Sequence, residues 1–473
     1  MQKLGLWFSY AALCAIIAVS AFFAYSAANK NPITGSELSF ISSVYSFSAK
    51  DGAQESRGAL LPRLVYSLPY IFRNMDAGTR ELLDRSRRQT LLESEKEGSL
   101  AVVSIARAGR YASVAFSVIF LVLLYFAARE VVGRYWALLP VFFLGFNPAF
   151  LGFAGAALPG IFMALSVFAA MCSFAVFLRR RTKLWLVSSG ISLFTALTST
   201  FAAIILPPLF LAIFALYFLA LIRDDSGEED PLFLYRLKIR AWRSLKSFLA
   251  LIGIAAALAY GLFFVFGDDF TREAARADEA AQSQYILWLR GNAALNPFSS
   301  YIQAAEEFSR SGRLGLSFFA TKDAFAREPL SSLIFVGFAF LLGVGRCVRG
   351  AVLSLFKGPG LSEYISTNSD EFTYLLTVPV LAMAGLTSPS DLLYVKLTIL
   401  PAIYLISASS IKKWFSVFDD NLVRNWVVKF MVFANSAGGL ALKWMLLMAL
   451  AVWYFVSAIY AAPDFLEYKN LLG

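Results

Sequence analysis

The residues of this chain that are best able to act chemically gather in segment 31–70. The segment follows the first apolar stretch and reads NPITGSELSFISSVYSFSAKDGAQESRGALLPRLVYSLPY. A carboxylate can take a proton from an attacking hydroxyl or amine, and an arginine can hold a phosphate leaving group. The chain contains no histidine, so carboxylates must do any acid–base work. The segment offers Glu37, Asp51, Glu55, Arg57 and Arg63.

Glu37 is the first candidate for a catalytic base, because it closely follows the first apolar stretch and so lies near the membrane face. Asp51 and Glu55 are secondary candidates. They lie in AKDGAQES, where Gly52 favours a turn. The alternative interpretation of all three carboxylates is that they are ordinary solvated loop residues.

The candidate contacts for an anionic substrate are Arg57, Arg63, Arg327 and Lys396. Lys396 lies inside the apolar string LLYVKLTILP, where a charge is costly unless it is paired or reaches the interface. The alternative is that these side chains lay their stems along apolar surface and extend their charges to water. No other ionisable side chain lies deep in an expected span, which argues against an ion-coupled transporter.

The composition is that of a membrane protein. The chain has 473 residues, of which 58% are hydrophobic and 16% aromatic, whereas soluble domains are about 45–50% apolar. The net charge of +10 resides mostly in loops between apolar stretches, which indicates membrane topology rather than a nucleic-acid partner. The spacing of the three cysteines fits neither a disulfide framework nor a zinc site.

We expect an all-α polytopic membrane protein with about eleven transmembrane helices, because each needs about 20 apolar residues. One continuous span is expected at 136–153. The expected organisation is a first transmembrane helix at 1–27, an extracytoplasmic loop with the candidate active site at 28–110, transmembrane helices two to seven at 111–266, a second extracytoplasmic loop at 267–328, transmembrane helices eight to eleven at 329–461, and an extracytoplasmic tail at 462–473.

The short connections between these spans differ in charge. One set is basic and contains Arg129, Arg134, Arg179, Arg180, Arg181, Lys183, Arg346, Arg349, Lys412 and Lys413. The opposite connections, 154–158 and 387–391, contain no lysine or arginine. Because basic loops stay in the cytoplasm, we expect a cytoplasmic N-terminus and an extracytoplasmic C-terminus.

A series of strings runs in order along the chain: TGSELSFISSVYSF, LLPRLVYSLPYIF, RYWALLPVFFLGFNPAFLGFAGAALPGIF, NPFSSYIQAAEEF, FAREPLSSLIFVGFAFLLG, LLYVKLTILPAIYLISA and APDFLEYKNLLG. Together they resemble motifs of the C-type superfold of membrane glycosyltransferases that use polyprenyl-phosphate-linked sugars. The nearest resemblance is to the protein O-mannosyltransferase-like and aminoarabinose-transferase-like enzymes. It extends over nearly the whole chain and implies their fold.

The polar residues of those motifs are largely replaced. Ser36 precedes Glu37 where the family has aspartate and then glutamate. The family's His-Pro-Pro-Leu run falls on residues 61–64, which read Leu-Pro-Arg-Leu, and its Thr-Asp pair falls on Ala-Leu-Pro-Gly at 157–160. Its lysine after the fifth span falls on Leu-Thr-Ser-Thr at 197–200. Cations remain at Arg327 and Lys396, where the family has lysine and arginine.

The resemblance leaves two functions open. The first is an enzyme that transfers a sugar from a polyprenyl phosphate to an extracytoplasmic acceptor. It would use Glu37 as the base and the four cations as leaving-group contacts, and its only foreseeable cofactor would be a divalent metal. The second is an inactive protein of the same fold that serves as a structural or lipid-binding subunit of a membrane complex. The missing aspartate and histidine favour the second.

The partners follow from the same resemblance. They are a polyprenyl-phosphate lipid, other membrane lipids and, for the second function, further membrane subunits. The resemblance also implies the inner membrane of a bacterium.

Overall fold

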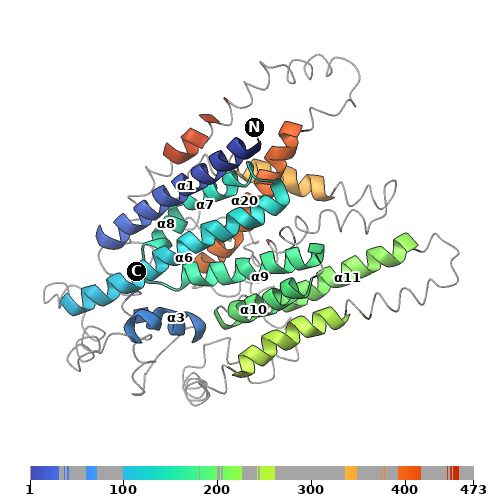
Figure 1. Ribbon diagram of the computed structural model, residues 1–473, viewed down its shortest axis with the longest axis horizontal. Helices are drawn as coiled ribbons and strands as arrows, with labels where there is room; N and C mark the ends of the chain where they lie inside the picture. Colours follow the sequence, from blue (N-terminus) through green and yellow to red (C-terminus); the bar gives the residue numbers. More distant parts are fainter. Residues whose placement is uncertain are drawn as a thin grey trace, which may run out of the picture.

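The described part of the chain is entirely helical and contains no strand. The structure is a computed structural model that describes residues 2–30, 37, 40–41, 60–71, 100–180, 182–199, 203, 206–225, 242, 245–261, 336–348, 374, 376, 378, 392–416, 445, 448–449 and 451–456. Its helices are α1 (Gln2–Lys30), α3 (Leu60–Ile71), α6 (Leu100–Val132), α7 (Leu138–Gly145), α8 (Pro148–Ala154), α9 (Gly160–Arg180), α10 (Lys183–Ser199), α11 (Leu206–Asp225) and α20 (Leu392–Ser416), as Figure 1 shows.

Three of the described helices are long and apolar enough to cross a membrane. Their spans are Ser9–Asn29 in α1, Ala106–Val132 in α6 and Gly160–Arg180 in α9. Shorter apolar helices occupy Leu206–Ala215, Leu245–Gly261 and Val336–Val348. The expected fold class, an all-α polytopic membrane protein, is therefore confirmed. The expected number of spans stays a prediction, because several of them fall outside the described residues.

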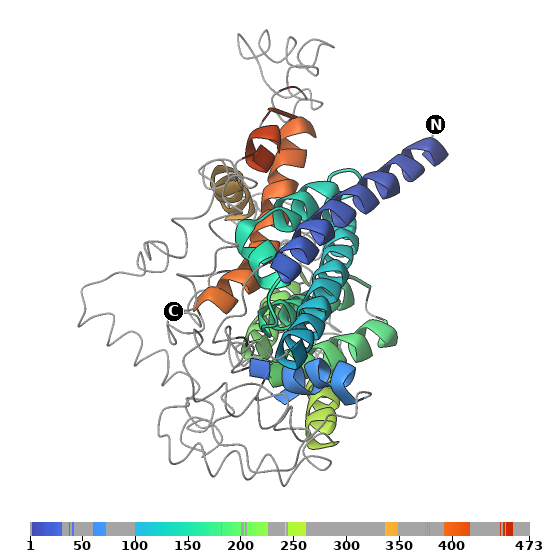
Figure 2. The same ribbon diagram turned by 90° about the vertical axis from the view of Figure 1, so that its left-hand side faces the viewer.

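Helix α9 forms the centre of the bundle. It packs against α10, α20 and α6, and most of its membrane-length segment is buried, whereas only a minor part of that of α1 is buried. Figures 1 and 2 show α1 along the outside of α6, α7 and α8. Aromatic rings fill the core. Phe120 of α6, for example, lies between Phe150 and Phe168, at centroid distances of 5.8 Å and 5.5 Å.

Small residues let neighbouring helices approach closely, as is usual in membranes. A Cβ atom added at Gly155 would lie 2.7 Å from Cβ of Ala27 in α1. A Cβ at Gly343 would lie 2.6 Å from Cγ2 of Ile406 in α20. These contacts leave no room for a methyl group, so glycine sets the distance between the helices.

The continuous span expected at 136–153 is wrong. This stretch forms two short helices, α7 and α8, that are separated at Asn147. The side chain of Asn147 accepts a hydrogen bond from the backbone N–H of Phe150 at 3.1 Å, and Pro148 begins α8. An asparagine cap followed by proline favours a new helix start. The Asn147 amide also donates to the Tyr404 hydroxyl of α20 at 2.9 Å, which fixes the break in the core.

The structure also begins the helix after the first outer loop earlier than we expected. Helix α6 begins at Leu100, so residues 100–110, which we assigned to the loop, form its first turns. The string SLAVVSIARAGRYASV contains no proline and has apolar residues at helical spacing. The two arginines made it look like a loop, but one of them is paired inside the protein, as described below.

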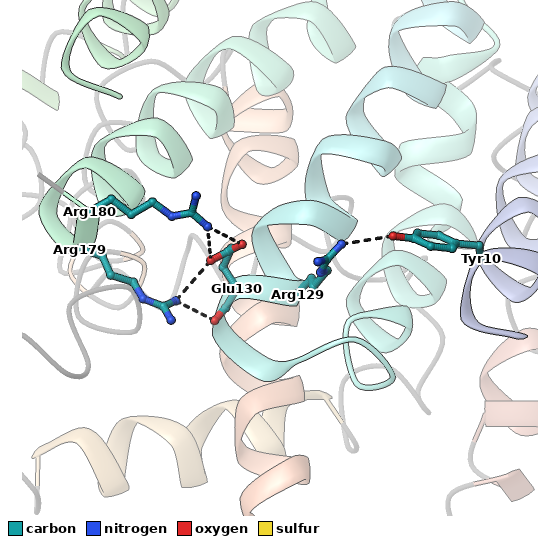
Figure 3. Close-up of polar contacts among 5 residues, drawn as sticks. All are labelled: Tyr10, Arg129, Glu130, Arg179 and Arg180. Carbon is teal, nitrogen blue, oxygen red and sulfur yellow. Dashed lines mark hydrogen bonds and ion pairs between the residues drawn. The ribbon is translucent and has the colours of Figure 1, made fainter. Parts of the chain in front are cut away.

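The cations of the basic connections gather at one end of the bundle. Arg129 of α6 donates to the Tyr10 hydroxyl of α1 at 3.3 Å. Arg180, at the end of α9, pairs with Glu130 of α6 at 3.0 Å (Figure 3). A Cβ at Gly133, just after α6, would lie 3.9 Å from Nζ of Lys412 in α20. The ends of α6, α9 and α20 therefore lie together.

Gly155→Ala tests the close approach of α8 to α1. The new methyl group would meet Cβ of Ala27 and the carbonyl oxygen of Ala24, neither of which can move without shifting α1. We expect a loss of about 1–3 kcal/mol in unfolding free energy, measured by thermal unfolding in detergent. Gly345→Ala is the matched control, because no atom lies within 4 Å of its added Cβ. Equal effects of the two substitutions would show that this helix contact is unimportant.

Candidate functional site

Glu37 lies inside the protein and forms a bidentate ion pair with Arg110 of α6. Arg110 Nε donates to Glu37 Oε1 at 2.8 Å, and Arg110 Nη2 donates to Oε2 at 2.7 Å. Glu37 is fully buried, with 0% of its surface exposed, and Arg110 is 2% exposed. Two parallel N–H···O bonds match the fork of a guanidinium to a carboxylate, which makes this one of the strongest pairings between side chains.

The same two side chains hold two backbone segments. The N–H of Ala157, in the turn between α8 and α9, donates to Glu37 Oε1 at 2.7 Å. Arg110 Nη1 donates to the carbonyl oxygen of Ala28, near the end of α1, at 2.9 Å. The ion pair therefore joins the segment around Glu37 to α6, to the end of α1 and to the turn before α9.

Helix α3 is fixed beside this ion pair by Tyr66. The Tyr66 hydroxyl lies 2.7 Å from Oγ of Ser113 in α6 and donates to the carbonyl oxygen of Leu158 at 3.0 Å. Its ring packs edge-on against Phe40, with 5.2 Å between centroids, and near Phe116 of α6. Tyr66 thus connects α3 to the same turn that the ion pair holds.

The structure describes three of the seven expected site residues, and only two of them with their side chains. Arg63 lies in α3, one turn before Tyr66, and its side chain is buried, with 3% exposed. Helix α3 packs against α6, so Arg63 and Glu37 belong to the same end of the bundle. Lys396 lies near the start of α20, where only the backbone is described. The others, Asp51, Glu55, Arg57 and Arg327, lie outside the described residues.

The geometry of Glu37 limits the chemistry available to it. A carboxylate has about four lone-pair sites, and three are occupied by Arg110 and the Ala157 amide. A catalytic base needs an acceptor proton within hydrogen-bond reach, whereas Glu37 has no surface exposed to solvent. The arrangement is well suited to holding helices together.

A divalent metal does not fit at Glu37. Such an ion takes several oxygen ligands and is usually bound through carboxylates, but both oxygens of Glu37 face the Arg110 cation. Within the described ranges, no cluster of three or more histidine, cysteine, aspartate or glutamate side chains is present.

Sequence reasoning missed Arg110, Tyr66 and Ser113. The string ARAGR, residues 106–110, was assigned to the end of a loop, and the next span was expected to begin at Tyr111. Its helical continuity with the apolar residues that follow was the signal for α6, and an arginine inside a helix at this depth needs a partner. No sequence signal identified the Ala157 amide, because its role depends on the backbone of a turn.

The ion pair can be tested by a double-mutant cycle. Removing one partner of a buried pair leaves an uncompensated buried charge, so Glu37→Met and Arg110→Met should each cost about 3–5 kcal/mol of unfolding free energy. Glu37→Met with Arg110→Met removes both charges and should cost less than either single change. The measurement is thermal or denaturant unfolding in detergent.

Glu130→Gln is the control for this cycle. Glu130 is the carboxylate of a partly exposed ion pair at the other end of the bundle, so its loss should cost less than about 1 kcal/mol. Additive effects of the two methionine substitutions would contradict a direct Glu37–Arg110 interaction.

The solved structures that resemble this chain include the following two. One is the oligosaccharyltransferase AglB from Archaeoglobus fulgidus, in complex with an inhibitory peptide and a dolichol-phosphate. It shares 14% identity at a TM-score of 0.48, over 96% of this chain and 56% of its own. The other is ArnT from Cupriavidus metallidurans bound to undecaprenyl phosphate, with 13% identity and a TM-score of 0.46 over 97% and 77%.

The chain therefore spans little more than half the length of the oligosaccharyltransferase. No protein-family model matches the chain, and no curated protein sequence matches it.

Proposed function

We propose that this integral membrane protein, which resembles C-type glycosyltransferases, binds a polyprenyl phosphate at the end that contains Glu37. In this proposal Glu37 has a structural role and the protein is not a transferase. The observation that carries the proposal is the burial of the Glu37 carboxylate against Arg110. Glu37 is the one surviving carboxylate of the family's first motif. Because this carboxylate is held in an ion pair, it is not available as the expected catalytic base.

The charge at this end of the bundle supports the binding of a phosphate. Among the described side chains there, Glu37 is the only carboxylate, and Arg110 balances it. The buried Arg63 and the exposed Arg107 bring two further guanidinium groups to this end. A site with a surplus of cations and low-dielectric walls attracts anions, and guanidinium groups suit phosphate oxygens.

The apolar surface beside these cations supports a lipid as the phosphate's carrier. On α6, the exposed Arg107 is followed one turn later by Tyr111, which is 40% exposed, and two turns after that by Ile119, which is 52% exposed. A lipid phosphate held by Arg107 and Arg63 would have this outward face of α6 available for its hydrocarbon chain.

We also infer that this end of the protein faces away from the cytoplasm. The basic connections lie at the opposite end, where α6, α9 and α20 finish together. Because such residues are retained in the cytoplasm, Glu37, Arg63 and Arg107 belong at the extracytoplasmic face. The assignment to a bacterial inner membrane comes from the resemblance in the sequence.

One observation favours the second candidate, an active polyprenyl-phosphate-dependent glycosyltransferase. Glu37 contacts the Ala157 amide, and Ala157 begins the stretch that corresponds to the family's Thr-Asp pair. Glu37 thus lies beside the site where that family carries a functional carboxylate. An active enzyme would have to release Glu37 from Arg110, or use Asp51 or Glu55 as its base.

Lipid binding can be tested with undecaprenyl phosphate and the purified protein in detergent. Arg107→Gln removes an exposed cation and should weaken binding about fivefold, since a cation near the phosphate contributes about 1 kcal/mol. Arg63→Gln should weaken it at least as much, because a buried cation is screened less by water. Native mass spectrometry or a thermal-shift titration gives the affinities. Arg180→Gln with Lys183→Gln, at the opposite end, is the control and should leave this affinity unchanged.

The second candidate function, an active glycosyltransferase, is tested by a separate measurement of sugar transfer. Wild-type protein incubated with a labelled undecaprenyl-phosphate sugar and a set of acceptors should release no labelled product under our proposal. Transfer by wild type that is lost in the Glu37→Met, Arg110→Met variant, while that variant still binds undecaprenyl phosphate, would instead establish the active transferase.

A further inference from the structure

A second group of ion pairs, which is partly exposed, lies at the basic end. Of the residues whose side chains the structure describes, only Glu37 and Glu130 are carboxylic acids. Arg180 Nη2 lies 3.0 Å from both carboxylate oxygens of Glu130, and Arg179 Nη1 donates to the Glu130 carbonyl oxygen at 2.9 Å. Figure 3 shows both arginines on one side of α6, while Arg129 points to the other side, toward Tyr10.

Cations greatly outnumber this one carboxylate. The described cations at the same end are Arg129, Arg134, Arg179, Arg180, Lys183, Arg346, Lys412 and Lys413. Arg179 and Arg180 remain about half exposed, at 48% and 49% of their side-chain surface, although both contact Glu130. Arg134, in the turn after α6, has a buried Nε that donates to no described residue. Among the described side chains, this end therefore contains eight cations and one carboxylate, and Arg180 and Lys183 are exposed.

The length of α9 leads us to expect these cations near the depth of the lipid phosphates. Arg179 and Arg180 occupy the last turn of α9, whose membrane-length segment has 21 residues. At about 1.5 Å per residue this segment is about 31 Å long, close to the hydrocarbon thickness of a bilayer. Arg129 occupies the last turn of α6, the second membrane-length helix that ends here. Residues just beyond such segments meet the headgroup layer.

An outward apolar face adjoins the cations directly. Lys183 begins α10 and is exposed. It is followed by Leu184, Val187 and Ile191, which are 72%, 43% and 45% exposed. Spacings of three and four residues place these three side chains on one face of the helix. A ligand that joins an anion to a hydrocarbon chain can contact the cations and this face together.

We propose that Arg180 and Lys183 form a binding site for the phosphate of an anionic phospholipid, whose acyl chain lies along Leu184, Val187 and Ile191 of α10. The arginines at a helix end also complement the helix dipole, and this accounts for Arg179, which donates to a carbonyl oxygen of α6. It does not account for Lys183, which lies at the start of a helix, where the dipole disfavours a cation. An anion from the membrane offsets that charge.

The test titrates delipidated protein in detergent with phosphatidylglycerol, with phosphatidylcholine and with inorganic phosphate, and counts bound lipid by native mass spectrometry. We expect wild type to retain phosphatidylglycerol in preference to phosphatidylcholine, with an affinity that falls as salt is added. Arg180→Gln with Lys183→Gln should weaken phosphatidylglycerol binding about 25-fold, because each cation contributes a factor of about five.

Two matched variants decide the interpretation. Arg129→Gln removes a cation at the same end that is directed to Tyr10, and Arg346→Gln removes a cation at the same end that donates to Ser409. Both should leave phosphatidylglycerol binding unchanged. Equal binding of phosphatidylcholine, equal losses in the two matched variants, or competition by millimolar inorganic phosphate would overturn the proposal. The outcome is independent of the proposed polyprenyl-phosphate site, because that site lies at the opposite end of the bundle and none of these substitutions changes it.

Discussion

The ion pair between Glu37 and Arg110 is the interaction on which one whole end of the bundle depends. Each of these buried charges would be expensive alone. The two side chains neutralise each other. In addition, Arg110 donates to the carbonyl oxygen of Ala28, and Glu37 accepts from the amide of Ala157. The pair thereby ties the end of α1 to α6 and to the turn before α9. Tyr66 then adds α3 to the same turn, so the placement of Arg63 depends indirectly on this ion pair.

The two ends of the protein use related chemistry in different surroundings. Each end has one described carboxylate that is held by arginine. At the Glu37 end the pair is buried and satisfied, so its main effect is to fix helices. At the Glu130 end the two arginines are half exposed and, among the described side chains, outnumber the acid. The same residue types therefore stabilise structure at one end and favour anion binding at the other.

The sequence predicted the helical membrane fold well, because long apolar stretches leave few alternatives to a helix in a bilayer. It failed at Asn147, where a cap and a proline divide a stretch that is apolar enough to look continuous. It also failed at Arg110, because charge alone made the start of α6 resemble a loop. Glu37 was found because a carboxylate near a membrane face is unusual. Its burial could not be foreseen, since its partner lies 73 residues away in the chain.

The contrast between the family's motifs and this chain has a physical interpretation. The histidine and the Thr-Asp pair of those motifs are replaced by residues that cannot carry charge. Glutamate remains at position 37, and Arg63 stands where the family's His-Pro-Pro-Leu run has proline. The chain has therefore lost a group that moves protons at neutral pH and has gained a cation. This change is one reason for proposing a binding protein rather than a transferase.

The most direct measurement is an experimental density map of the protein with undecaprenyl phosphate bound. We expect the lipid phosphate beside Arg63 and Arg107, with the Glu37 carboxylate still in bidentate contact with Arg110 at about 2.7–2.9 Å. A map in which Arg110 has turned toward the phosphate, leaving Glu37 open to an acceptor, would contradict the structural role of Glu37 and favour an active transferase.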